Sequence, residues 1–133
     1  MTSSDPRERP YANGRARIDA RDFDHLAVAL AEVGPRTFKA AAMVTEKAAR
    51  DIERDAKAFA PVDTGNLRAS IGTDIDVSAA SISATIGATA DYAAYVEYGT
   101  STMAPRAHLG PAYDRHVGTW MTALDRLMSG VLG

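Results

Sequence analysis

The sequence predicts an α+β fold in which a long helix and a C-terminal helix pack on a small, mainly antiparallel sheet. Residues 36–59 and 112–128 carry apolar side chains at three-and-four spacing, which is typical of amphipathic helices. Between them, two short stretches alternate apolar and polar residues, which is typical of strands buried on one face. The chain has 133 residues, which suits one domain with a modest core.

The first twenty residues contain little that could be buried. They are polar and rich in Arg, Asp and Pro, with an Asn13-Gly14 turn signal. We expect residues 1–20 to form an N-terminal arm, held by a neighbouring subunit or folded back on its own domain, and residues 21–133 to form a single domain. A short helix should follow the arm and end at Gly34 and Pro35.

The long helix should use an alanine-rich stripe to approach another element closely. Its opposite face is charged, so the stripe is expected to pack in the core, although a subunit contact would use the same pattern. The stripe consists of Phe38, Ala41, Ala42, Thr45, Ala48, Ala49, Ile52, Ala56 and Phe59.

A hinge should separate this helix from the sheet. Pro61 cannot continue a helix, Asp63 and Thr64 offer side-chain acceptors, and Gly65 is free to take positive φ. From Leu67 the apolar residues recur at every second position, which predicts a strand over residues 67–77. We therefore interpret these five residues as a structural motif that joins the helical layer to the sheet.

A second strand over residues 81–88 lies close enough to form an antiparallel hairpin with the first. A short helical turn should follow and end at Gly99. Glu97 falls between Tyr95 and Tyr98 in this turn, where partial burial would require donors such as arginines or backbone N–H groups. We favour a structural anchor over a catalytic acid for Glu97, with Gly99 as part of the same motif.

Composition excludes several classes of function. The chain has no cysteine, so disulfides, thiolate chemistry and cysteine zinc sites are excluded. No apolar run reaches the length of a membrane helix, and the N-terminus lacks the apolar core of a signal peptide, so we expect a soluble protein made in a cytoplasm. Three scattered histidines do not predict a metal site, and no cofactor motif is present.

The sharpest enzymatic alternative is a dimeric aspartic protease that uses Asp63-Thr64-Gly65. In such enzymes this tripeptide follows an apolar strand, whereas here it follows a charged helix and a proline. A turn whose side chains satisfy free backbone groups explains the tripeptide more simply. We therefore do not expect an enzyme.

Three ordered motifs carry a family resemblance: A-P-V-D-T-G-N-L-R-A-S-I at residues 60–71, Y-A-A-Y-V-E-Y-G-T at residues 92–100 and P-R-A-H-L-G-P-A at residues 105–112. Over roughly residues 25–127 the chain resembles the head-to-tail joining, tail-completion or neck proteins of long-tailed double-stranded DNA bacteriophages. The resemblance implies a structural virion protein at the head-to-tail junction, synthesised in the host cytoplasm. It also implies a homo-oligomeric connector ring, with six-fold symmetry favoured and twelve-fold symmetry open.

The expected partners of such a ring are neighbouring neck, tail-terminator or tail-tube proteins, and double-stranded DNA that passes during viral genome ejection without specific binding. Residues 61–104 hold one arginine against five carboxylates, which argues against a phosphate-gripping surface. Asp74 and Asp76 alternate with apolar residues and should face solvent. We expect one of them to face the channel, where an acidic wall would keep DNA mobile; the alternative is that both only solubilise the outer surface.

Overall fold

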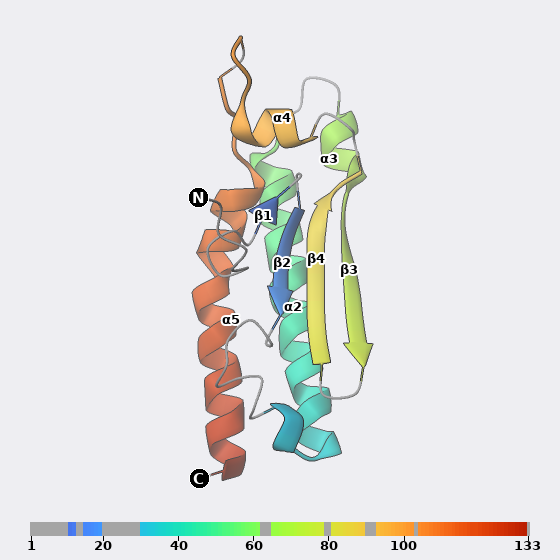
Figure 1. Ribbon diagram of the computed structural model, residues 1–133, viewed down its shortest axis with the longest axis vertical. Helices are drawn as coiled ribbons and strands as arrows, with labels where there is room; N and C mark the ends of the chain where they lie inside the picture. The colour runs from blue at the N-terminus through green and yellow to red at the C-terminus, as the bar shows by residue number, and fades with distance from the viewer. Residues whose placement is uncertain are drawn as a thin grey trace, which may run out of the picture.

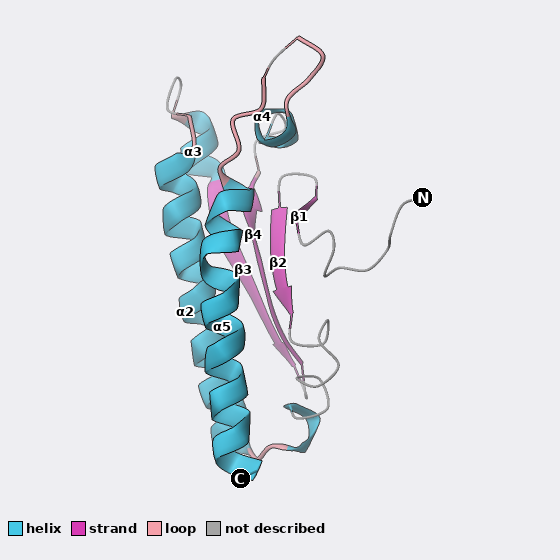
Figure 2. Ribbon diagram, turned by 90° about the vertical axis from the view of Figure 1, so that its left-hand side faces the viewer, coloured by secondary structure: helices cyan, strands magenta, loops and turns pink. Residues whose placement is uncertain are grey.

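Two long helices lie side by side along one face of an antiparallel sheet (Figure 1 and Figure 2). This arrangement confirms the predicted α+β fold. The computed structural model describes residues 11–12, 15–19, 30–61, 65–78, 81–89, 93–102 and 104–132. The helices are α2 (Pro35–Phe59), α3 (Asn66–Ser70), α4 (Ala93–Tyr98) and α5 (Leu109–Leu132), and the strands are β1 (Tyr11–Ala12), β2 (Arg15–Asp19), β3 (Ile71–Ser78) and β4 (Ser81–Ala88). None of the helices in these ranges is long and apolar enough to cross a membrane.

The sheet has the strand order β1-β2-β4-β3, and each neighbouring pair is antiparallel. Strands β3 and β4 form the expected hairpin, in register from Ile71↔Ala88 to Ser78↔Ser81. Because side chains alternate across a strand, this register puts the isoleucines and alanines of β4 on the face that α2 covers. The other face carries polar side chains and glycines.

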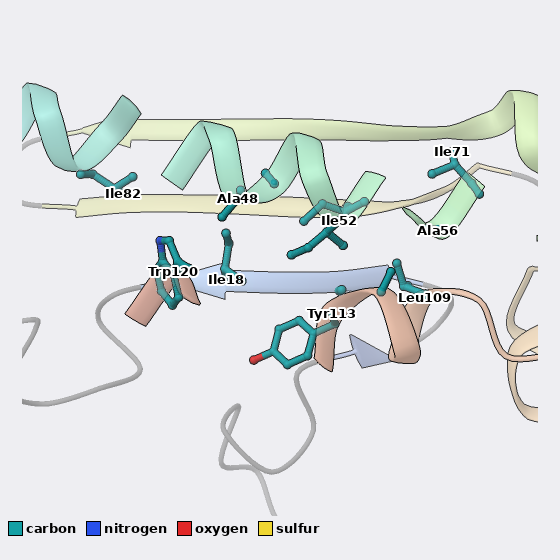
Figure 3. Packing of buried hydrophobic residues seen from close by; sticks show 14 of the residues in the cluster. Ile18, Ala48, Ile52, Ala56, Ile71, Ile82, Leu109, Tyr113 and Trp120 are labelled. Atoms are coloured by element: carbon teal, nitrogen blue, oxygen red, sulfur yellow. The ribbon is translucent and has the colours of Figure 1, made fainter. Parts of the chain in front are cut away.

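Helix α2 packs through the small residues of its apolar stripe. Ala41, Ala49 and Ala56 are fully buried, and Ile52 projects from the same face into the core (Figure 3). Short side chains allow α5 to lie close to α2, and Trp120 of α5 fills the remaining space. The indole Nε1 of Trp120 donates to Thr45 Oγ1 at 3.0 Å, so the polar edge of a buried aromatic ring is satisfied.

One end of the stripe differs from the prediction. Phe59 is the last residue of α2, and 40% of its surface is exposed. The helix ends there, because the C-cap Ala60 has an extended backbone. The helical spacing of apolar residues therefore predicted burial for Phe59, which the structure shows to be exposed.

The hairpin begins four residues later than predicted, because residues Asn66–Ser70 form helix α3. The amide of Ala69 donates to the carbonyl of Gly65 at 3.0 Å, which closes one helical turn. Leu67 and Ile71 are both buried, and their spacing of four fits a helix as well as a strand. Up to Ile71 the spacing of apolar residues therefore does not distinguish a helix from a strand.

Part of the expected N-terminal arm belongs to the sheet. Residues Arg15–Asp19 form an inner strand of the sheet, with Ala16 opposite Ile86 and Ile18 opposite Ala84 of β4. Ala16 and Ile18 are almost completely buried between the sheet and the helices. Residues 11–12 and 15–19 thus fold back on their own domain, which is one of the two expected positions of the arm, while residues 1–10 and most of the predicted short helix lie outside the described residues.

Because Ile18 is in the core, Ile18→Ala should lower the free energy of unfolding by about 2–5 kcal/mol through lost burial and the cavity left behind. Urea denaturation measures this change. Val77→Ala is a matched control, since Val77 is 47% exposed and its truncation should change stability by about 0.5 kcal/mol or less. Equal stabilities of the Ile18 variant and the control would show that β2 does not belong to the core.

Candidate functional site

Glu97 caps helix α5 from a different helix. Glu97 is 4% exposed and lies on α4. Oε1 accepts the backbone N–H groups of His108 at 3.0 Å and Leu109 at 2.8 Å, and Oε2 accepts that of Gly110 at 2.9 Å. These donors belong to the start of α5 and have no partners within the helix. The negative charge also stabilises the positive end of the helix dipole.

Both ends of the loop between α4 and α5 are attached to α4. Gly99 takes φ 78, and its N–H donates to the carbonyl of Tyr95 at 2.7 Å, which ends α4. Further along, the N–H of Arg106 donates to the carbonyl of Val96, also at 2.7 Å. His108 is buried, with Nδ1 3.1 Å from Oε1 of Glu97. The loop therefore projects from a fixed base at one end of the molecule (Figure 2).

The described part of the hinge lies between two helices. Gly65 has φ 72, the left-handed conformation that glycine adopts without strain, and Leu67 is buried. Arg68 Nε donates to the carbonyl of Lys57 at 3.0 Å and so satisfies a free carbonyl near the end of α2. Asp63 and Thr64 lie outside the described residues. The candidate protease tripeptide is therefore described only at its glycine, and the described element before it is helix α2.

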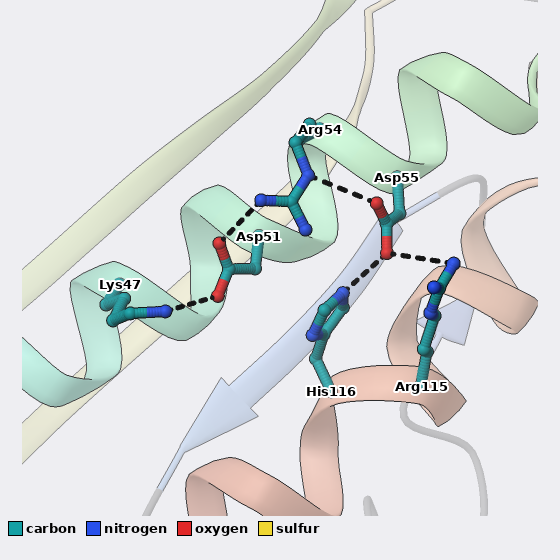
Figure 4. A network of polar contacts seen from close by, with 6 residues as sticks. All are labelled: Lys47, Asp51, Arg54, Asp55, Arg115 and His116. Atoms are coloured by element: carbon teal, nitrogen blue, oxygen red, sulfur yellow. Dashed lines mark hydrogen bonds and ion pairs between the residues drawn. The ribbon is translucent and has the colours of Figure 1, made fainter.

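A polar network joins α2 to α5 at the rim of the core (Figure 4). The Asp55 carboxylate bonds to His116 Nε2 at 2.6 Å and accepts from Arg54 Nε at 3.2 Å, while an Arg115 nitrogen lies 3.7 Å away. The hydrogen bond with His116 lowers the pKa of Asp55, despite the burial that acts to raise it. No local pattern in the sequence indicates this pair, because its members are 61 positions apart.

Two further groups on α2 have lowered pKa values. The hydrogen bond from Lys47 Nζ, at 2.8 Å, lowers the pKa of Asp51. A hydrogen bond from the Thr73 hydroxyl, at 2.6 Å, lowers the pKa of Glu53 and ties α2 to β3. These contacts stabilise the ionised carboxylates and hold the helices and sheet together.

The network shows no hydrolytic arrangement. Among the described residues His116 bonds to no hydroxyl group, so the Asp–His pair lacks the nucleophile of a catalytic triad. The same ranges contain no group of three side chains arranged to hold a metal ion. The described arrangement braces α2 against α5.

The polar face of the sheet carries Asp74 and Asp76, and both are exposed. Neither makes an ion pair with a described residue. The strand register places Arg17, Thr85 and Asp74 in one row across the sheet. An acidic stretch of sequence therefore becomes a face of mixed charge, because β2 brings arginines beside β4. A hollow of about 230 Å³ lies over Gly72 and Gly87 on this face.

Removing the carboxylate of Glu97 should destabilise the fold strongly. Glu97→Ala leaves three buried N–H groups without their acceptor, and we expect a loss of about 2–4 kcal/mol in the free energy of unfolding. Glu46→Ala is the control, because Glu46 is exposed on α2. A thermal melt of the Glu97 variant that matches the control would refute the capping role.

The Asp55–His116 pair should make stability depend on pH in the acid range. The lowered pKa means that Asp55 contributes stability above its unfolded value of 3.8 and loses it as the pH falls through the folded value. The difference in unfolding free energy between wild type and Asp55→Asn should therefore be largest at neutral pH and shrink below about pH 4. Ser101→Ala, in the exposed loop, should show no such trend. A pH-independent difference for Asp55→Asn would contradict the assignment.

Comparison with known proteins identifies a phage family. The family model described as "Bacteriophage HK97-gp10, putative tail-component" matches residues 24–99. This segment is more than half of the chain and includes the hinge, the β3–β4 hairpin and Glu97. Searches of curated proteins and of solved structures found no match. The matched family agrees with the resemblance to tail-completion proteins, and the chain belongs to the HK97 gp10-like family of bacteriophage tail components.

Proposed function

We propose that this tail component is one subunit of a ring at the head-to-tail junction, and that the phage genome passes through the ring during ejection. Six-fold symmetry would match the tail, and the neighbours would be neck, tail-terminator or tail-tube proteins. The role is geometric and requires no catalysis or cofactor. Head-to-tail contacts between identical subunits close such a ring when the rotation between neighbours is a simple fraction of a turn.

The observation that carries this proposal is the loop between α4 and α5. Its described residues from Thr100 to Ala107 are exposed, yet Val96, Glu97 and Gly99 hold its base in a defined position. A projecting loop on a rigid base is typical of contact surfaces. An enclosed ligand pocket would instead be expected in an enzyme.

Exposed aromatic side chains lie beside this loop. Tyr95 is 59% exposed and Tyr98 is 48% exposed, both on α4. Phe59 is 40% exposed at the end of α2, which lies at the same end of the molecule (Figure 1). Tyrosine and phenylalanine are enriched in protein interfaces, where they contribute large contact areas. These three residues and the loop lie at one end of the subunit. Their exposure supports a role for this end as the surface that contacts a neighbouring ring.

The charge of the polar sheet face is compatible with DNA that passes without binding. Clustered lysines and arginines would hold phosphates through counterion release. Here Arg15 and Arg17 share the face with Asp74 and Asp76, so no purely basic surface forms. This mixed charge supports passage of DNA more than a fixed DNA contact.

Tyr95→Asp should reduce incorporation of the protein into phage particles by about tenfold or more, because a charge at an interface centre costs binding energy. The melting temperature should stay unchanged, since Tyr95 is mostly exposed. Quantitative immunoblots of purified particles measure incorporation. Met43→Asp is the matched control, because Met43 is also exposed but lies in the first half of α2, away from Phe59.

Normal incorporation of the Tyr95 variant would show that this end is not an interface. A cryo-electron microscopy map of the particle tests the ring itself. A map that places the protein outside any ring at the junction would refute the proposed function, whatever the Tyr95 variant does.

A further inference from the structure

Strand β3 is a sheet edge whose outer side has no partner among the described residues. On its inner side β4 pairs with every residue from Ile71 to Ser78. In an antiparallel pair, alternate residues of an edge strand direct their N–H and C=O groups away from the partner. An extended segment can bind these groups as an added strand, and its side chains then decide the specificity.

The side chains of β3 disfavour pairing with a second copy of β3 and favour pairing with a basic segment. Asp74 and Asp76 are two positions apart, so both project from the polar face, and neither has an ion pair in the described part of the chain. If two copies of β3 paired antiparallel about Ile75, Asp74 would lie opposite Asp76 twice. Like charges directly opposite are destabilising. The edge instead fits a segment with two basic residues at alternate positions.

The N-terminal segment of this chain has that pattern. Residues 1–10 include Arg7-Glu8-Arg9, and in an extended conformation both arginines project from one face. The other pair at this spacing, Arg15 and Arg17, already lies in β2 and is paired with β4. The segment therefore matches the two carboxylates in charge and in spacing.

The position of the segment favours a neighbouring copy as the acceptor. Residue 10 is followed by β1, which is the edge opposite β3 in the strand order (Figure 1). Subunits arranged head to tail in a ring bring opposite edges of successive sheets together. Arg9 lies two residues before Tyr11, so it reaches at most about 7 Å from β1. The β3 edge of the next subunit must therefore lie directly beside β1.

We propose that Arg7-Glu8-Arg9 of one subunit adds as a short strand to the β3 edge of the next subunit, with its arginines paired to Asp74 and Asp76. Pro6 and Pro10 bound the added strand, because proline donates no ladder hydrogen bond. Within a ring, the tethered segment meets its site at high effective concentration, so a short contact is sufficient. This proposal rests on the ring proposed above, and it gives the two carboxylates a protein partner instead of DNA.

Disulfide trapping tests the contact directly, because the chain has no cysteine of its own. If Arg7 and Arg9 pair with the two carboxylates, Glu8 lies opposite Ile75 whether the added strand runs parallel or antiparallel. Particles that carry Glu8→Cys with Ile75→Cys should, after oxidation, give a ladder of disulfide-linked multimers on a non-reducing gel. Each single-cysteine variant should give no ladder. A bond formed only within one chain, or no bond in intact particles, would overturn the proposal.

Charge reversal tests the pairing by an independent route. The double change Asp74→Arg with Asp76→Arg, and the double change Arg7→Asp with Arg9→Asp, should each lower the incorporation of the protein into particles by about tenfold. The four changes together should restore incorporation. Glu46→Arg with Asp114→Arg reverses two exposed carboxylates on the helices and should have no effect.

The outcomes separate this inference from the function on which it rests. Failure of the combined variant to recover, while each pair is defective, would overturn the pairing. If the β3 variant assembles normally but ejects DNA more slowly at low salt, the carboxylates face DNA and the docking proposal is wrong. A particle map without a ring would instead refute the proposed function itself.

Discussion

The contact between Glu97 and the start of α5 orders one end of this protein. A buried carboxylate with three backbone donors is stable only when the donors are held in place, and α5 supplies them at its first turn. The same contact fixes α4 relative to α5. The intervening loop can therefore project into solvent without disturbing the core.

The seam between α2 and α5 depends on small side chains. Ala41, Ala49 and Ala56 allow the helices to approach closely, and Trp120 fills the space that they leave. Hydrogen bonds at the seam then specify one arrangement: the indole bonds to Thr45 inside, and His116 bonds to Asp55 at the rim. Apolar contact supplies most of the stability, while these directional bonds hold the helices in one register.

The sheet has one apolar face and one polar face. Helices cover the apolar face, and the polar face carries charges of both signs on β2 and β3. Its long edge, β3, is protected against self-pairing by Asp74 and Asp76.

The sequence alone determined the parts of this protein that depend on local patterning. Helix α2, the β3–β4 hairpin and the stop at Pro61 follow from apolar spacing and from proline chemistry, and the ordered motifs indicated the phage family. Burial of Glu97 could also be anticipated, because it stands between apolar residues. The sequence did not indicate which donors its carboxylate binds, because arginines and many backbone N–H groups were possible partners.

Only the tertiary structure decided the rest. Ala16 and Ile18 are too few to predict a strand, and they become core residues because β4 offers an open edge and α5 covers them. Residues Asn66–Ser70 form a helix. The four-residue spacing of Leu67 and Ile71 fits a helix as well as a strand, and the Gly65 carbonyl accepts the first helical hydrogen bond. Asp55 and His116 meet across 61 positions. Contacts between distant segments leave no periodic trace in the sequence, because their free energy is realised only when the chain has folded.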